Sequence, residues 1–390
     1  MKKYFMLTLF FLFLICLFNC AKEEHPFVTL YKEKGIDAVV ISGKPSGDKS
    51  LYYFEEVLSI GGEEPEPVVF QPGECLIDDD GNLYFSDEGR IKKFDQNGNF
   101  VQFIGTKGLG PGEIDFPSLK QIFIDTLLVG QSRWRGGKKL EVFDIKGKYI
   151  KRINYPTFSK SIFEGRRNSL ECYIGGDIFL VSSSLMEKQE SKLFNEPKFG
   201  FAYSDGRVFR ELDLTIEKFA STIDFGGMGT SMPFAQIQCP VYYNKKLYIL
   251  SQNGTDIFIF SKNGDMIKAI KLNFQGTEVT NEEIEKYFSN WPEEYAKLAR
   301  KVDLPDRKPF VYDIIVDNTG KLWLNKGGTF GVNPSEVDEY IYIVIDEKGK
   351  YVADQVVPVK LIKVMNGFAY GFQVKEDGLK IFKKYRLRMR

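Results

Sequence analysis

The stretch from Pro72 to Glu113, PGECLIDDDGNLYFSDEGRIKKFDQNGNFVQFIGTKGLGPGE, decides the fold of this chain. It holds four short segments rich in aromatic and β-branched residues, separated by turns of Asp, Asn and Gly: Glu74–Ile77, Asn82–Ser86, Arg90–Phe94 and Asn99–Ile104. Such a pattern predicts a four-stranded antiparallel meander. One meander cannot bury both of its faces alone, so the fold needs further copies of it.

The chain supplies those copies. The turn Asp78–Tyr84 (DDDGNLY) recurs as Asp317–Trp323 (DNTGKLW). The element Phe94-Asp95-x-x-Gly98 recurs in related form at three later places: Phe143–Gly147, Phe260–Gly264 and Ile345–Gly349. Self-similarity at about 40–50 residues, with four strands in each unit, is typical of a β-propeller.

Six units fit the chain, with inner strands beginning near Glu74, Lys120, Leu170, Ile237, Val311 and Leu361. The last unit, Leu361–Tyr385, has only three clear strands. We expect the isolated segment Leu51–Ile60 (LYYFEEVLSI) to complete it, which leaves no free inner edge. The sequence therefore predicts an all-β, six-bladed β-propeller with four-stranded antiparallel blades, closed by pairing of its N- and C-terminal segments. The basic end, Lys383–Arg390, is expected as an edge strand or tail.

Three motifs carry a resemblance to a known family. They are Gly105–Pro117 (GTKGLGPGEIDFP), the turn Asp78–Tyr84 and the strand Arg90–Asp95 (RIKKFD). Together they resemble the NHL-type repeats of six-bladed propellers, most closely in the first blade. The resemblance implies a β-propeller lipoprotein of Gram-negative bacteria.

The N-terminus predicts export. Met1-Lys2-Lys3 is followed by the apolar run Tyr4–Phe18, the pattern of a secretory signal. Leu17-Phe18-Asn19-Cys20 resembles a lipobox, so we expect residues 1–19 to be a lipoprotein signal peptide and Cys20 to be lipidated. An ordinary cleaved signal and an uncleaved anchor are the alternatives. The lipobox predicts a cell-envelope lipoprotein anchored in the outer membrane, facing the periplasm or the cell surface.

The rest of the chain divides into two parts. Residues 20–50 are expected to form a lipidated tether with one apolar strand, Ile36–Ser42, and residues 51–390 the propeller. One helical insertion is expected at about 278–303. Thr280 and Glu283 form a capping box there, and Ile284, Tyr287 and Phe288 share one helical face.

Composition excludes several functions. Lys+Arg 53 against Asp+Glu 53 gives no net charge to attract nucleic acid. His25 is the only histidine, so Ser-His-Asp catalysis, Cys-His catalysis and histidine-ligated zinc are excluded. Cys75, Cys172 and Cys239 are expected as small buried thiols, and a Cys172–Cys239 disulfide is the alternative. Asp78-Asp79-Asp80-Gly81 lacks the spaced ligands of a calcium loop and is expected to be a turn.

Strand parity locates the expected binding face. In a four-stranded meander, turns 1–2 and 3–4 lie on one face, and the other connections lie on the opposite face. The D-x-x-G turns fall in the first class. The expanded connections fall in the second class: Ser132–Lys138, Tyr155–Asn168, Ser184–Glu196, Thr215–Gln236, Asn273–Pro309 and Lys326–Asp338. Because loops on a rigid scaffold usually carry binding, we expect the ligand on that face.

Arg133, Trp134 and Arg135 are the first candidate ligand-binding residues, since Trp and Arg are enriched at binding hot spots. Arg166 and Arg167 are further candidates. In the structural alternative, Trp134 packs on its own blade and the arginines are solvated.

The sequence thus favours a non-enzymatic, lipid-anchored propeller that binds a protein or glycan ligand, with no cofactor indicated. The alternative is a metal-dependent, lactonase-like hydrolase in which Asp, Glu and Asn hold a divalent cation at the channel mouth.

Overall fold

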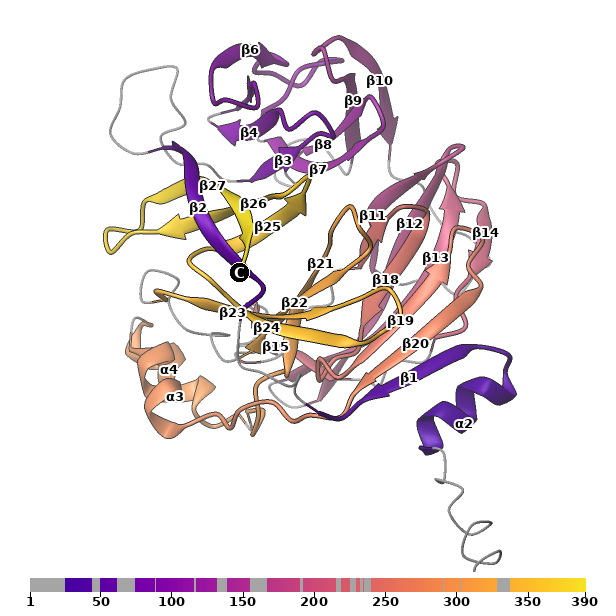
Figure 1. Ribbon diagram of the computed structural model, residues 1–390. Helices are drawn as coiled ribbons and strands as arrows, with labels where there is room; N and C mark the ends of the chain where they lie inside the picture. Colours follow the sequence, from indigo (N-terminus) through magenta and orange to yellow (C-terminus); the bar gives the residue numbers. More distant parts are fainter. Residues whose placement is uncertain are drawn as a thin grey trace, which may run out of the picture.

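The computed structural model describes residues 25–43, 50–61, 74–87, 89–115, 117–131, 139–154, 167–189, 192–214, 219–224, 229–231, 234, 240–289, 291–302, 304–327 and 337–390. Within these residues the chain forms six blades around one axis (Figure 1). Each blade is built on four consecutive antiparallel strands, except the last, which takes its outer strand from the N-terminal part of the chain. The predicted six-bladed β-propeller is confirmed.

The blades follow the order of the sequence. Blade one contains β3 (Cys75–Ile77), β4 (Leu83–Asp87), β5 (Arg90–Phe94) and β6 (Phe100–Ile104). Blade two contains β7 (Pro117–Phe123), β8 (Thr126–Gln131), β9 (Lys139–Asp144) and β10 (Tyr149–Asn154). Blade three begins with β11 (Arg167–Gly175), β12 (Ile178–Gln189), β13 (Lys192–Tyr203) and β14 (Val208–Glu211).

The second half of the ring has the same plan. Blade four contains β17 (Val241–Tyr243), β18 (Lys246–Leu250), β19 (Asp256–Ser261) and β20 (Met266–Leu272). Blade five contains β21 (Val311–Val316), β22 (Leu322–Lys326), β23 (Tyr340–Ile345) and β24 (Tyr351–Val357). Blade six contains β25 (Lys360–Met365), β26 (Phe368–Val374), β27 (Lys380–Met389) and, as its outer strand, β2 (Tyr52–Ile60).

The hydrophobic core is divided among the six spaces between neighbouring blades. Each space holds one cluster of buried apolar side chains contributed by both blades. The cluster between blades six and one, for example, joins Tyr370 and Phe382 to Phe85 and Phe94. Because every blade is buried on both faces, its strands alternate between two cores instead of between a core and solvent. This explains why central strands such as β18 (KLYIL) and β23 (YIYIVI) are apolar at nearly every position.

Strand β2 closes the ring. It pairs antiparallel with β27, from Tyr52 opposite Met389 to Ile60 opposite Phe382, as the sequence predicted. The basic residues of β27 face acidic residues of β2: Lys383 lies 2.9 Å from Glu56, and Arg388 lies 3.0 Å from Glu55. The expectation of a free edge strand or tail at Lys383–Arg390 was therefore wrong, because β2 covers this strand.

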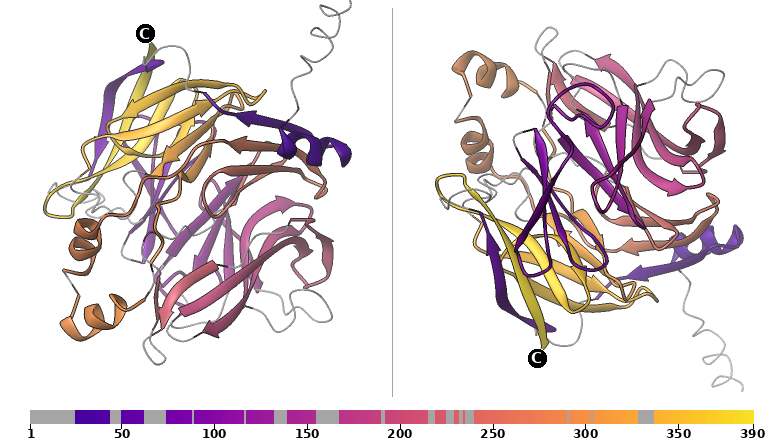
Figure 2. Two further views of the ribbon diagram at one scale, coloured as in Figure 1. Left: turned by 90° about the horizontal axis from the view of Figure 1, so that it is seen from below. Right: turned by 90° about the horizontal axis from the view of Figure 1, so that it is seen from above.

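The N-terminal segment extends blade four. After helix α2 (Pro26–Glu33), strand β1 (Asp37–Ile41) pairs in parallel with β20 and becomes the fifth strand of this blade. Phe27 and Tyr31 of the helix pack against the cluster between blades three and four. The part of the chain that we expected as a tether therefore contains a helix in addition to the predicted strand, and both lie along the outside of the ring (Figures 1 and 2).

Blade three is the most elaborated. Strands β12 and β13 pair from Ile178 opposite Tyr203 to Gln189 opposite Lys192. The expected loop Ser184–Glu196 is therefore a long hairpin. Strand β15 (Phe219–Asp224) pairs with the first residues of β13, and β16 (Gly229–Ser231) pairs with β15.

The predicted helical insertion is present as α3 (Asn281–Phe288) and α4 (Glu293–Ala299). Thr280 and Glu283 form the predicted capping box at the start of α3. Phe288 and Ala296 of the two helices pack against Ile223 of β15, so the insertion rests on the extension of blade three.

Candidate functional site

The two faces of the ring differ in their connections. The short-turn face carries the connections between the first and second and between the third and fourth strands of each blade. The long-loop face carries all the other connections. On the short-turn face the D-x-x-G turns share one geometry. The backbone N–H of the first residue donates to the fifth residue and the glycine N–H donates back to the first, as in Asp95–Asn99.

The long-loop face is not built up evenly. Tight turns at Ser251–Gly254 and Lys375–Gly378 lie on this face in blades four and six. The long connections 132–138, 155–166 and 328–336 and the helices α3 and α4 belong to blades two to five.

Most of the predicted ligand-binding residues lie outside the described residues. Arg133, Trp134, Arg135 and Arg166 fall in segments that the structure does not describe. Arg167 is the first residue of β11, and its backbone pairs with Ser184. Strand parity places the ends of β8 and β9, which flank residues 132–138, on the long-loop face.

The glycine-rich connection between blades one and two has a structural role. Glu113 accepts a hydrogen bond of 2.7 Å from the N–H of Gly110, and a Cβ on Gly108 would lie 2.1 Å from its carboxylate. Arg152 bonds the carbonyl oxygen of Gly110 and the buried carboxylate of Glu141, each at 2.6 Å. The glycine-rich motif that resembles NHL-type repeats is therefore a loop between two blades, held in place by hydrogen bonds to Glu113 and Arg152.

A row of polar side chains in blade five was missed by the sequence reasoning. Asp313, Asn325 and Tyr342 are cross-strand partners on β21, β22 and β23. The Asn325 Nδ2 donates to the Tyr342 hydroxyl at 3.1 Å, and its buried Oδ1 has no hydrogen-bond partner among the described residues. Burial raises the pKa of Asp313, although Lys360 opposes the shift. The detectable signal was one Asp and one Asn within otherwise apolar strands.

The carboxylate of Asp78 is hydrogen-bonded within its own turn. The carboxylate of Asp78 accepts hydrogen bonds from the N–H groups of Asp80 and Asn82, from the Asn82 side chain and from the Tyr84 hydroxyl, at 2.8–3.1 Å. These donors occupy both of its oxygens. Across all the residues that the structure describes, no three His, Cys, Asp or Glu side chains gather in a way that could hold a metal ion.

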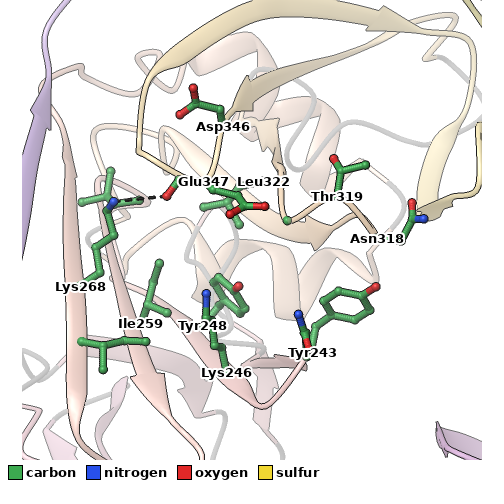
Figure 3. A pocket seen from close by; sticks show the side chains of 14 residues that line it. Tyr243, Lys246, Tyr248, Ile259, Lys268, Asn318, Thr319, Leu322, Asp346 and Glu347 are labelled. Carbon is green, nitrogen blue, oxygen red and sulfur yellow. Dashed lines mark hydrogen bonds between the residues drawn. The ribbon is translucent and has the colours of Figure 1, made fainter.

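Two adjoining cavities open on the short-turn face. The larger, of about 380 Å³, lies between blades four and five (Figure 3). The smaller, of about 160 Å³, lies at the end of the central channel and is lined by Asp79, Lys363 and Asn366. Tyr243 and Asn318 line both cavities. Burial lowers the pKa of Lys363, against the opposing charges of Asp79 and Asp78.

The thiols of Cys75 and Cys172 are free, and burial raises the pKa of both. Cys239 lies outside the described residues, as does Cys20. None of the helices in the described part of the chain is long and apolar enough to cross a membrane.

Comparison with known proteins shows no family for this chain. Neither a protein-family model nor a curated protein sequence matches this chain. Among solved structures, a putative exported protein from Bacteroides fragilis is similar at 13% identity and a TM-score of 0.48, over 91% of this chain and 99% of that one. BamB from Moraxella catarrhalis is similar at 9% identity and a TM-score of 0.32, over 88% and 92% of the two chains.

A gluconolactonase from Xanthomonas campestris is similar at 10% identity and a TM-score of 0.36, over 87% and 88% of the two chains. At these identities the likeness concerns the fold alone. The six blades described above make this chain a six-bladed β-propeller, and its function has to be argued from its own residues.

Proposed function

We propose that this protein is a lipid-anchored propeller of the cell envelope that binds a protein or glycan ligand through its long-loop face, without catalysis. The observation that carries the proposal is the asymmetry of the ring. The long hairpin β12–β13 and the helices α3 and α4 extend from blades three and four, while the D-x-x-G turns keep the opposite face short. A rigid ring with elaborated loops on one face is suited to recognition.

The anchor is proposed at Cys20. Met1–Phe18 has the pattern of an export signal and Leu17–Cys20 resembles a lipobox. Several acyl chains hold a protein stably at a membrane, whereas one chain alone binds only marginally. The proposed location is the outer membrane, with the propeller facing the periplasm or the cell surface.

The anchor is tested by growing cells with labelled palmitate. The wild-type chain should incorporate the label and sediment with membranes, and Cys20→Ser should abolish both. Cys75→Ser, which leaves the lipobox intact, is the matched control. Membrane association of an unlabelled Cys20→Ser chain would contradict the lipid anchor.

The binding face is tested by site-specific photo-crosslinking in intact cells. We expect a photoreactive residue at position 134 to give a defined crosslinked product. The same residue at Lys348, in a turn of the short-turn face, should give none. Arg133→Ala with Arg135→Ala should reduce the product at position 134. Equal products at both positions, or product unaffected by the arginine changes, would contradict binding at this face.

A further inference from the structure

The larger cavity on the short-turn face is a second site, on the face opposite the one proposed above. Its walls come from β17–β20 of blade four and from two turns of blade five, Asp317–Gly320 and Asp346–Gly349 (Figure 3). Its volume of about 380 Å³ falls in the range of small-molecule sites, about 300–1,000 Å³. The cavity is therefore large enough for a small ligand and too small for a folded partner.

The inner part of this cavity is apolar. Ile259 of blade four lies opposite Leu322 of blade five, and the ring of Tyr248 lies beside them with only 5% of the residue exposed. Ile270 also lines the cavity. Only the edges of these side chains reach the cavity, because all four belong to the core between blades four and five and are at most 7% exposed. Ligand pockets typically combine such a wall with a few precisely placed polar groups.

Many of the polar groups around the cavity already have partners. The Asp346 carboxylate accepts from the N–H groups of Lys348 and Lys350. The Thr319 hydroxyl donates to Asp317, and the Asn318 amide donates to Asn366. The Lys268 ammonium forms an ion pair with Asp37 and donates to the Glu347 carbonyl oxygen. These bonds hold the turns and β1 in place. They make the cavity wall rigid before any ligand arrives.

Five lining groups have no hydrogen-bond partner among the described residues: the hydroxyls of Tyr243 and Tyr248, the Asn244 amide, the Lys246 ammonium and the Glu347 carboxylate. Lys246 and the tyrosines belong to blade four, and Glu347 belongs to blade five. A Cβ on Gly320 would lie 2.8 Å from the Glu347 Oε1, so the absence of a side chain there lets Glu347 lie across the turn.

The protonation of these groups suits a ligand with hydroxyl groups. Burial, together with Glu347 and Tyr243, raises the pKa of Tyr248 to about 12. Its hydroxyl is therefore protonated at neutral pH and can both donate and accept. Lys246 only donates and an ionised Glu347 only accepts. A ligand that bonds to all of them must offer both donors and acceptors, as a molecule with several hydroxyl groups does.

The charge of the cavity disfavours ionic ligands. Two lysines, Lys246 and Lys268, are balanced by two acidic residues, Asp346 and Glu347. A phosphate or a polycation therefore gains no net attraction. A free amino acid would need its ammonium and carboxylate partners close to one carbon atom, whereas Lys246 and Glu347 stand on different blades.

We propose that this cavity binds a small neutral saccharide. Its hydroxyl groups bond to Tyr243, Tyr248, Lys246 and Glu347, and its C–H groups contact only the edges of Tyr248 and the aliphatic side chains. The site goes beyond the proposed function, because it lies on the opposite face and does not depend on the long loops.

The test is calorimetric titration of the full chain with D-glucose, D-galactose, N-acetyl-D-glucosamine and maltose, and with L-leucine and AMP for comparison. At least one saccharide should bind, and leucine and AMP should not. Tyr248→Phe and Glu347→Gln should each weaken saccharide binding about tenfold, the effect of losing one hydrogen bond to a charged or buried group. Both variants should keep the thermal midpoint of the wild type.

Glu376→Gln is the matched control. Glu376 is the second residue of the turn Lys375–Gly378 on the long-loop face, as Glu347 is in its own turn, and it is exposed. This variant, and Arg133→Ala with Arg135→Ala, should keep the wild-type affinity for the saccharide. The proposal is overturned if no saccharide of the set binds at millimolar concentration, if leucine or AMP binds instead, or if saccharide binding survives both cavity variants unchanged.

Discussion

Two aspartates explain at the residue scale why one turn motif recurs. The Asp78 carboxylate accepts hydrogen bonds from its own turn and from the Tyr84 hydroxyl. The Asp317 carboxylate accepts from its own turn and from the Trp323 indole N–H at 3.0 Å. Both aromatic residues are fully buried. The aspartate therefore joins a surface turn to the polar atom of a core side chain.

Asp317→Ala should lower the free energy of unfolding by about 2–4 kcal/mol, because it leaves the buried indole N–H of Trp323 and the turn N–H groups without an acceptor. Urea denaturation measures the change. Asp346→Ala is the matched control, since within the described part of the chain the Asp346 carboxylate accepts only from the exposed N–H groups of Lys348 and Lys350. Its loss should be at most about 1 kcal/mol. Equal losses at the two positions would refute this account.

The buried thiols should be chemically inert in the folded chain. Burial raises the pKa of Cys75 and of Cys172 well above the ordinary value of 9.0, and the thiolate is the form that reacts. Iodoacetamide at pH 8 should modify both at least about 100-fold more slowly than in urea, measured by peptide mass spectrometry. Modification at the unfolded rate would show that the inner strands open readily.

The same shift has a defined effect on stability. Because folding favours the neutral thiol, this contribution is fully present below pH 9.0 and is lost as the pH rises above that value.

Residue-scale prediction succeeded where the signal is local. Asp-x-x-Gly turns are specified by four consecutive residues, and glycine at the last position allows the left-handed conformation observed at Gly320 (φ 83°). The polar row of Asp313, Asn325 and Tyr342 depends on the register between three strands. No local pattern specifies that register, so the sequence could not predict the row. The cavity at Tyr248 and Glu347 depends in the same way on how two blades meet.

At the element scale, the closing strand and the N-terminal segment make different contributions. Strand β2 supplies Leu58 and Ile60 to the core between blades six and one, and Phe54 packs edge-on against Tyr385 at 5.9 Å. Strand β1 and helix α2 only add to a blade that is already complete. Loss of β2 breaks the ring, whereas loss of β1 and α2 leaves it closed.

A variant that begins at Ser50 should therefore remain folded with a modest decrease in Tm. A variant that begins at Gly61, and so also lacks β2, should lose more than about 10 °C in Tm or fail to show a cooperative transition. Differential scanning calorimetry of both variants compares them directly. A cooperative wild-type Tm in the shorter variant would contradict closure by β2.

The sequence predicted β2 but not α2, for a physical reason. The segment of β2 is apolar, and the last repeat unit, Leu361–Tyr385, shows only three strands. A four-stranded sixth blade therefore required one more strand. Helix α2 is only eight residues long and contains Val28 and Thr29, which have low helix propensity. Its helical form depends on packing Phe27 and Tyr31 against blade four, near Phe258, and short helices need such tertiary support.

At the scale of the whole molecule, the sequence predicted the ring because periodicity is a global property that needs no register. The division of the core into six interfaces follows from the same repetition. The position of the cavities was not predicted. The lengths of the connections show which face carries long loops, but they do not show where neighbouring blades leave a cavity between them. Both described cavities lie on the face with the shorter turns.

The proposed non-catalytic function predicts the metal content of the whole protein. Protein purified without chelators and then dialysed should retain less than about 0.1 divalent ion per chain, measured by elemental analysis, because carboxylates such as Asp78 already accept hydrogen bonds on both oxygens. One tightly held divalent ion per chain would support the lactonase-like alternative. Its loss in an Asp313→Asn variant would then locate the ion.

The pairing of β2 with β27 also constrains how the protein is made. Glu55 and Arg388, which bond in the finished ring, are 333 positions apart. At 5–20 residues per second, a ribosome needs roughly 15–70 s to synthesise the intervening chain. Until then, β27 is missing from the sixth blade and β2 has no strand to pair with. The incomplete propeller therefore has two open edges. Biogenesis should therefore depend on holdase chaperones that shield these edges until the last ten residues arrive.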